Sequence, residues 1–167
     1  MSHVLHRNIN TSVPIVESAD GNYLIDENGK RYLDASGGAA VSCLGHTNQR
    51  VINAIKDQLD KVSFAHTGVF SNTAAEELAT YLIKNTPDGF GNGRAMFLGS
   101  GSEAMEAALK LARQYHLEKG DKARSKIIAR DRSYHGNTLG ALATGGHKQR
   151  QAPFAPLLID VLHIPPC

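Results

Sequence analysis

The sequence predicts an α/β fold: a small antiparallel meander with a helix, followed by the first strand–helix–strand unit of an incomplete, mostly parallel sheet. Three observations support this prediction. Short apolar runs within 13–34 flank Asn28-Gly29, the strongest short-range signal for a hairpin. Apolar residues then recur at helical spacing in several later segments. Finally, apolar runs at 95–98 and 126–130 flank the longest of these helices, as in a βαβ unit whose strands are parallel.

Capping residues indicate where the predicted helices begin. Thr47 or Asn48 can cap a helix that extends to about residue 62, because short polar side chains satisfy the free N–H groups of a first turn. Thr73 and Ser100 each stand three residues before a glutamate, which is the spacing of a capping box. They predict a helix from 73 to about 84 and another that begins inside a glycine-rich turn. The tail from Pro153 onward shows no terminal helix or other closing element.

The glycine-rich turn, Gly99-Ser100-Gly101-Ser102, has the features of an anion site. The first N–H groups of a helix lack intrahelical partners and lie at the positive end of the helix dipole. The hydroxyl groups of Ser100 and Ser102 add further donors. The same residues also suit an ordinary capped helix after a tight turn, and their spacing alone leaves both interpretations open.

Two phosphate-bearing cofactors fit such a turn. The run from Gly99 to Ala104 has the form G-x-G-x-x-A of a dinucleotide-binding fingerprint, and Asp131 follows the next strand. Glu103 argues against this class, because its carboxylate would lie near a doubly charged pyrophosphate. Pyridoxal phosphate needs only one helix N-terminus and an aromatic partner for its ring, which Tyr134 could supply.

Composition excludes several other classes of function. The 167 residues carry a net charge of +2 and no basic block, so nucleic acid is not an expected partner. No apolar run approaches the roughly 18 residues of a membrane span, so no membrane association is expected. The two cysteines, Cys43 and Cys167, form no disulfide framework, which suits a reducing compartment. A cytoplasmic location is the expectation.

Several motifs occur in an order that resembles one known family. They are the runs N-G-K-R-Y-L-D at 28–34, L-G-H at 44–46, a helix-forming run at 98–113 and S-Y-H-G-N-T-L-G-A-L at 133–142. Over residues 13–167 the chain is similar to the amino-terminal part of the class III pyridoxal-phosphate-dependent aminotransferases, also called the omega or ornithine/acetylornithine type. This resemblance favours pyridoxal 5'-phosphate (PLP) over a dinucleotide.

The resemblance implies roles for individual residues. Gly101 and Ser102 would bind the coenzyme phosphate, with Ser100 beside them. Tyr134 would stack on the pyridine ring, and His135 would lie close to it. These five positions match the cofactor-binding motifs of the family.

The resemblance also implies an aspartate aminotransferase-like fold and its division into domains. Residues 1–70 would belong to the small domain and a connecting loop, and 71–167 would begin the large PLP-binding domain. Gly38, Ala39 and Phe70 match positions near the substrate pocket of the family. No metal site is implied.

The family transfers an amino group from an amine or amino acid to a keto acid, and it forms homodimers. Its catalytic lysine, and the aspartate that pairs with the pyridine nitrogen, match positions beyond Cys167. We therefore expect a truncated chain, inactive alone, for which no catalytic residue is assigned. Two alternatives remain: a non-catalytic remnant that binds phosphate or PLP or partners a full-length subunit, and an unrelated dinucleotide-binding α/β protein.

Overall fold

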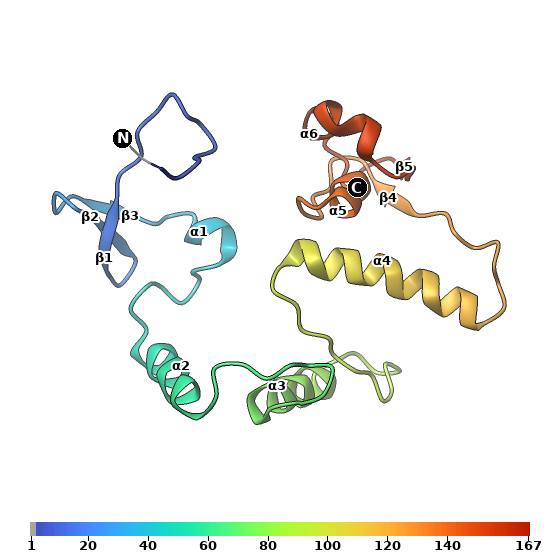
Figure 1. Cartoon of the computed structure of the whole chain (residues 1–167), viewed down its shortest axis with the longest axis horizontal. Helices are drawn as coiled ribbons and strands as arrows, with labels where there is room; N and C mark the ends of the chain where they lie inside the picture. Colours follow the sequence, from blue (N-terminus) through green and yellow to red (C-terminus); the bar gives the residue numbers. More distant parts are fainter. Residues whose placement is uncertain (1–2) are drawn as a thin grey trace. The chain divides into compact units, whose positions relative to one another are not determined.

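A computed structural model describes residues 3–167 of the chain, which divides into two compact units (Figure 1). The first unit extends to Ser71 and the second is Asn72–Cys167. The assignment of the two units to the small and large domains of a complete fold stays a prediction.

The first unit contains the antiparallel meander that the sequence predicts within 13–34. Its strands are β1 (Val16–Asp20), β2 (Tyr23–Asp26) and β3 (Arg31–Leu33), and they pair in the order β1-β2-β3. Both pairings are antiparallel. The turn that joins β2 to β3 contains Asn28-Gly29, as expected for a hairpin signal between two apolar runs.

The carboxylate of Asp26 holds this turn together. It accepts hydrogen bonds from the N–H groups of Asn28 (3.0 Å) and Lys30 (2.9 Å) and from the hydroxyl group of Tyr32 (2.9 Å). Gly29 adopts a left-handed conformation, with φ of +77°, which glycine tolerates best. Burial by itself would raise the pKa of Asp26, but the hydrogen bonds from Tyr32, Lys30 and Asn28 outweigh it and lower the pKa.

Two helical segments follow the meander. The first, α1 (Gly37–Ala40), is a single turn with left-handed backbone angles. The second, α2 (Gln49–Lys61), begins where the sequence predicts. Of the two capping candidates, Asn48 is the cap, because its side chain accepts a hydrogen bond from the N–H of Val51 at 3.3 Å.

The second unit begins with two helices, α3 (Thr73–Lys84) and α4 (Gly101–Glu118). The helix predicted from 73 to 84 is confirmed, but its cap is not Thr73. The side chain of Asn72 instead accepts a hydrogen bond from the N–H of Ala75 at 3.0 Å. Among residues 3–167, no helix is long and apolar enough to cross a membrane.

A parallel pair of strands lies at the end of the second unit. β4 (Ile128–Arg130) pairs with β5 (Leu162–Ile164), and Ala129 lies opposite His163. β5 corrects the expectation that the tail has no closing element. A short apolar run such as 162–164 becomes a strand only through its distant partner, which a local pattern does not reveal.

The crossover between these strands is also different from the predicted one. The run at 95–98 is not a strand, and Met96, Phe97 and Leu98 are between 44% and 69% exposed. The described chain offers this run no partner strand, so its backbone N–H and C=O groups have no strand with which to form a ladder. The parallel unit therefore extends from β4 to β5. Three short helices lie between them: α5 (Leu139–Thr144), α6 (Lys148–Gln151) and the 3-10 helix η1 (Ala152–Leu157).

Helix α5 forms most of the buried core of the second unit. Five of its six residues are buried, and Ala141 is fully inaccessible. Small residues allow neighbouring backbone segments to approach each other closely here. At Gly146, just after α5, an added Cβ would meet the backbone of Arg132, Arg130 and Asp131, so only glycine fits there.

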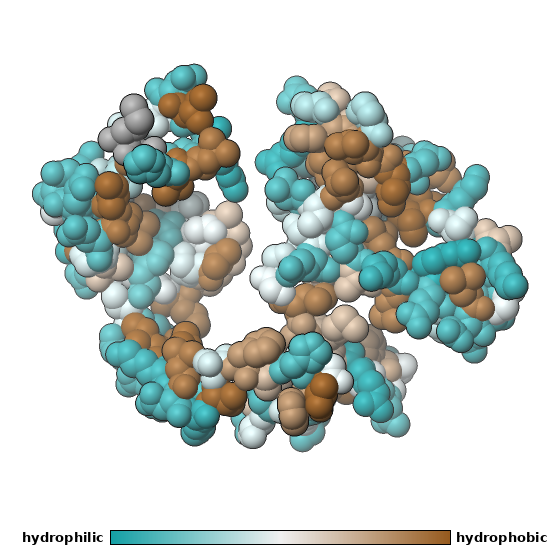
Figure 2. Space-filling model, viewed as in Figure 1, coloured by the Kyte–Doolittle hydropathy of each residue, from teal (hydrophilic) through white to brown (hydrophobic). Residues whose placement is uncertain are grey.

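Much apolar surface remains uncovered in both units. Figure 2 shows hydrophobic residues at the visible surface of both units. On α2, Val51, Ile55 and Leu59 are each at least 40% exposed along the apolar side of the helix. Soluble monomers rarely leave so many large apolar side chains in contact with water.

Candidate functional site: the amino end of α4 and the 134–137 loop

The amino end of α4 presents backbone donors that have no partner. Ser100 precedes the helix in an extended conformation, and its hydroxyl group accepts a hydrogen bond from the N–H of Glu103 at 3.2 Å. This confirms the predicted cap. The N–H groups of Gly101 and Ser102 form no hydrogen bond within residues 3–167. Apart from its chain neighbours and its own helix backbone, nothing lies within 4 Å of the position that a Cβ on Gly101 would occupy.

Ser102 also contacts the loop that follows β4. Its hydroxyl oxygen accepts a hydrogen bond from the N–H of Asn137 at 2.9 Å. Gly136 packs beside it, and a Cβ on that residue would lie 2.5 Å from the Ser102 hydroxyl oxygen and 2.9 Å from its Cα. The φ of Gly136 is +133°. Glycine is therefore required there both for space and for backbone conformation.

A second contact joins α4 to the same region. The carboxylate of Glu106 accepts hydrogen bonds from the N–H groups of Gly140 (2.8 Å) and Ala141 (3.2 Å), which belong to the first turn of α5. A negative charge at a helix N-terminus is favourable. The Thr138 hydroxyl group, together with these two N–H groups, lowers the pKa of Glu106. No local sequence pattern predicts this contact, because it joins positions more than 30 residues apart.

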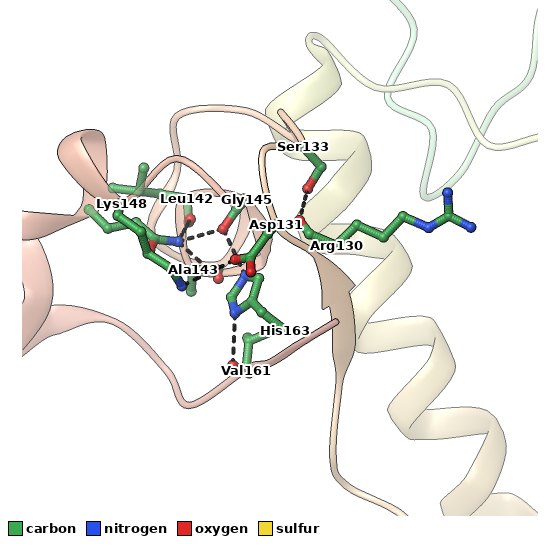
Figure 3. Close-up of polar contacts among 10 residues, drawn as sticks. Arg130, Asp131, Ser133, Leu142, Ala143, Gly145, Lys148, Val161 and His163 are labelled. Carbon is green, nitrogen blue, oxygen red and sulfur yellow. Dashed lines mark hydrogen bonds and ion pairs between the residues drawn. The ribbon is translucent and has the colours of Figure 1, made fainter. Parts of the chain in front are cut away.

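The other end of α5 is held by side chains from later in the chain. The side-chain amide of Gln151 donates to the carbonyl oxygens of Leu142 (3.0 Å), Ala143 (3.3 Å) and Gly145 (2.5 Å). On β5, His163 places Nε2 2.9 Å from the carbonyl oxygen of Gly145 (Figure 3). These groups satisfy carbonyls that a helix C-terminus leaves free.

The close-up also shows how the start of the loop is held. Asp131 and Lys148 form an ion pair at 3.6 Å, and the hydroxyl group of Ser133 donates to the carbonyl oxygen of Arg130 at 2.6 Å (Figure 3). The loop from 131 to 138 is therefore attached at its start to β4 and α6. Further along, it is attached to α4.

Tyr134 stands within this loop with an accessible ring. Its side chain is 61% exposed, and the guanidinium group of Arg150 lies 5.2 Å from its ring centroid. At this distance a cation is attracted electrostatically to the face of an aromatic ring. His135 follows and is partly buried. The sequence did not predict the role of Arg150, because a lone arginine on a short helix carries no pattern.

The structure therefore brings Ser102 together with the loop that contains Tyr134 and His135. The other three predicted residues lie in the first unit. Gly38 and Ala39 belong to α1. The N–H of Phe70 donates to the carbonyl oxygen of His66 at 2.9 Å. The proximity of these three residues to a substrate stays a prediction.

Comparison with known proteins decides the family. The sequence profile described as "Aminotransferase class-III" matches residues 4–167. This chain belongs to the class-III aminotransferases. It is 46% identical, over 99% of its length, to an uncharacterised aminotransferase of Schizosaccharomyces pombe, of which it covers 36%. It is 40% identical, over 87% of its length, to the acetylornithine aminotransferase of Shewanella oneidensis, of which it covers 35%.

Solved structures of aminotransferases agree with this assignment. The adenosylmethionine-8-amino-7-oxononanoate aminotransferase of Methanocaldococcus jannaschii superposes with a TM-score of 0.90 at 34% identity, over 98% of this chain and 38% of that one. The omega transaminase of Pseudomonas jessenii, solved in complex with PMP, gives 0.85 at 32% identity, over 92% and 34%. The chain thus spans about a third of the length of the relatives it matches. The α/β fold class is confirmed.

The hydrogen-bond donors at the amino end of α4 are chemically compatible with the phosphate group of PLP. The N–H groups of Gly101 and Ser102, which have no partner within residues 3–167, lie at the positive end of an 18-residue helix. The Ser102 hydroxyl oxygen accepts from Asn137, which leaves its hydrogen free to donate. Three donors of this kind suit a phosphate group.

Proposed function

We propose that this chain forms the coenzyme-binding part of a PLP-dependent aminotransferase, which transfers an amino group from an amine or amino acid to a keto acid. One observation carries the proposal: the Ser102 side chain, beside two free N–H groups, is hydrogen-bonded to the loop that carries Tyr134. Ser102 would thereby join the proposed phosphate site to the loop that contains the aromatic ring. Family membership supports the same assignment.

Each residue would have a defined task. The N–H groups of Gly101 and Ser102 and the Ser102 hydroxyl group would bind the phosphate, with Ser100 fixing the turn. Tyr134 would cover one face of the coenzyme ring and exclude water from it, with His135 alongside. The bound coenzyme supplies an electron sink for the amino-transfer chemistry.

The activity, the substrates and the homodimer of the complete enzyme are part of the proposal. We expect the 167 residues by themselves to bind the phosphate group without catalysing transfer, since no lysine among them matches the catalytic position. Gly38, Ala39 and Phe70 are proposed to lie near the substrate. The exposed, unpaired cysteines are in keeping with a cytoplasmic location, which we also propose.

Two alternatives make different predictions. A non-catalytic remnant would bind PLP as the first proposal expects, and would differ only in showing no turnover with any partner chain. Tighter binding of NAD than of PLP would replace our proposal with the dinucleotide alternative.

Gly101 allows a sharp test of the phosphate site. Gly101→Pro removes one N–H donor, and proline suits the first position of a helix. Ser100 has φ −158° and ψ 163°, a conformation that a following proline tolerates. We expect the dissociation constant for PLP, measured by isothermal titration calorimetry, to rise roughly tenfold, or about 1.4 kcal/mol, as for one lost hydrogen bond to a charged group.

Gly101→Ala is the matched control, because it keeps the N–H and places its methyl group in open space. It should bind PLP as the unaltered chain does. Equal affinities for the proline and alanine variants would contradict the phosphate site.

Tyr134 tests the ring-binding half separately. Tyr134→Leu should weaken binding of PLP but leave the affinity for inorganic phosphate unchanged, since phosphate has no ring to stack. Tyr134→Phe retains the aromatic face and should bind both ligands normally. If Tyr134→Leu binds PLP as well as Tyr134→Phe does, the stacking role is wrong.

A further inference from the structure

The turn α1 has an unusual backbone. Gly38 (φ 58°, ψ 40°), Ala39 (φ 61°, ψ 46°) and Ala40 (φ 71°) are all left-handed. Gly37 has φ of 58° as well, so four consecutive residues share this conformation. Left-handed backbone suits glycine, but in alanine the Cβ is crowded by the following carbonyl oxygen. Such a turn persists only where its surroundings determine it.

Hydrogen bonds within the turn itself contribute to its left-handed conformation. The carbonyl oxygen of Gly37 accepts from the N–H groups of Val41 and Ser42, both at 2.8 Å. These two bonds close the turn but involve neither oxygen nor N–H of Ala39. Two longer bonds involve Ala40: its N–H donates to the carbonyl oxygen of Ser36 at 3.4 Å, and the Sγ of Cys43 donates to the carbonyl oxygen of Ala40 at 3.4 Å. None of these four bonds involves Ala39.

Asp34 connects the turn to the segments on either side of it. Its Oδ1 accepts from the N–H of Gly38 at 3.0 Å and from the hydroxyl group of Ser36 at 3.3 Å. Its Oδ2 accepts from the hydroxyl group of Ser42 at 2.7 Å and lies 3.0 Å from Nε2 of His46. The side chain is only 10% exposed, although it belongs to a unit with few buried residues.

The chemistry of the group matters as much as its position. Four donors surround Asp34, and a carboxylate has two acceptor oxygens to receive them. Hydrogen bonds from Ser42 and Gly38, with His46 and Ser36, outweigh burial and lower the pKa of Asp34 to about 2. The group is therefore charged at any ordinary pH. An asparagine of the same size would turn an NH₂ group toward two of these donors.

We propose that Asp34 is a positioning residue that holds the 37–40 turn in its left-handed form, with Ser42 and His46 fixing the carboxylate from the far side of the turn. Asp34 thereby sets where Gly38 and Ala39 lie. The relevance of that placement to substrate rests on the proposed function. The action of Asp34 on the turn does not, and it can be tested without coenzyme.

The test is nuclear magnetic resonance on the coenzyme-free chain. Three-bond couplings between the amide and α protons of Ala39 and Ala40 report φ directly, and hydrogen exchange of the Gly38 amide reports the hydrogen bond to Asp34. In Asp34→Asn we expect the couplings to lose the left-handed values and the Gly38 amide to exchange at least tenfold faster. The amides paired between β2 and β3 should keep their exchange rates.

A double-variant cycle separates positioning from general support of the unit. Ala39→Gly with Ala40→Gly removes the crowding that makes the turn depend on Asp34. In that background Asp34→Asn should change Gly38 exchange by less than half as much, on a logarithmic scale. An equal effect in both backgrounds would overturn the proposal.

If Asp34→Asn does not fold, Ser42→Ala gives the same information in a milder form. It removes one of the four donors, and we expect an intermediate rise in Gly38 exchange. Unchanged couplings and exchange in either variant would overturn the proposal. The experiment is independent of the Gly101 variants, so either result can fail without the other.

Discussion

Ser102 and Asn137 lie 35 residues apart in the sequence, yet the Ser102 hydroxyl oxygen accepts a hydrogen bond from the Asn137 N–H at 2.9 Å. This contact fixes the loop after β4 against the amino end of α4. It also uses the serine as an acceptor and leaves its hydrogen available to a ligand. One side chain thus has both a structural task and a proposed binding task.

Gly136→Ala tests how closely the loop and α4 are packed. The new methyl group would lie within 3 Å of Ser102 atoms, at a φ that alanine rarely adopts. We expect a loss of about 1–3 kcal/mol in the free energy of unfolding, as for overpacking with backbone strain. Urea unfolding followed by circular dichroism measures it. Gly101→Ala, in open space, should lose nothing, and equal stability of the two variants would contradict the packing described.

Glu106→Gln removes a charge but little volume from the N-terminus of α5. At pH 7 we expect the variant to be about 1 kcal/mol less stable, because a carboxylate interacts better than an amide with free N–H groups. The pKa of Glu106 is lowered from its ordinary value of 4.5, so the unfolded chain binds this proton more readily. The advantage of the unaltered chain is complete above pH 4.5 and disappears as the pH falls through the lower, folded-state pKa.

Urea unfolding at pH 7 and at pH 3 provides the measurement. The difference in stability between the unaltered chain and Glu106→Gln should shrink at the lower pH. Glu77→Gln removes a charge from an exposed position on α3 and serves as the control. A difference that stays constant with pH would show that the carboxylate charge is not what stabilises α5.

The sequence was informative wherever the determining contacts are local. Caps and apolar spacing located α2, α3 and α4, and Asn28-Gly29 located the hairpin, because each depends on residues within one or two turns of chain. The Asn72 cap was missed since Thr73 offers an equally suitable side chain one residue later. Ser100 and Gly101 were found because a helix start is also a local feature.

Non-local contacts could not be predicted in the same way. The runs at 95–98 and 162–164 are both short and apolar, but only the second has a partner strand in the described chain. The attachment of Glu106 to α5 joins two helices across more than 30 residues. The resemblance of 133–142 to a family motif made Tyr134 a candidate, yet it gave no indication that the Arg150 guanidinium group lies 5.2 Å from the centroid of its ring.

Asp26→Ala tests the turn of the first unit. It removes three acceptor contacts, from the N–H groups of Asn28 and Lys30 and from the Tyr32 hydroxyl group. We expect the amides of Asn28 and Lys30 to lose their protection from hydrogen exchange, with the second unit unaffected. Glu27→Ala, at the neighbouring exposed position, is the control and should leave both amides protected. Retained protection in Asp26→Ala would mean that the hairpin does not depend on this carboxylate.

Gln151→Ala tests the other end of α5. Its amide donates to the carbonyl oxygens of Leu142, Ala143 and Gly145, and without it these partly buried groups lose a donor. A buried acceptor left without a partner costs about 1–3 kcal/mol, and we expect a destabilisation in that range.

Gln149→Ala, an exposed position on the same short helix, removes an equal side chain and should change stability by less than 0.5 kcal/mol, roughly the limit for surface sites. Because Gly145 also faces His163 at 2.9 Å, part of the cap survives in Gln151→Ala, and the α5 amides should exchange faster without unfolding entirely. Two variants of equal stability would show that α5 is held by its packing alone, and not by the amide at its carboxyl end.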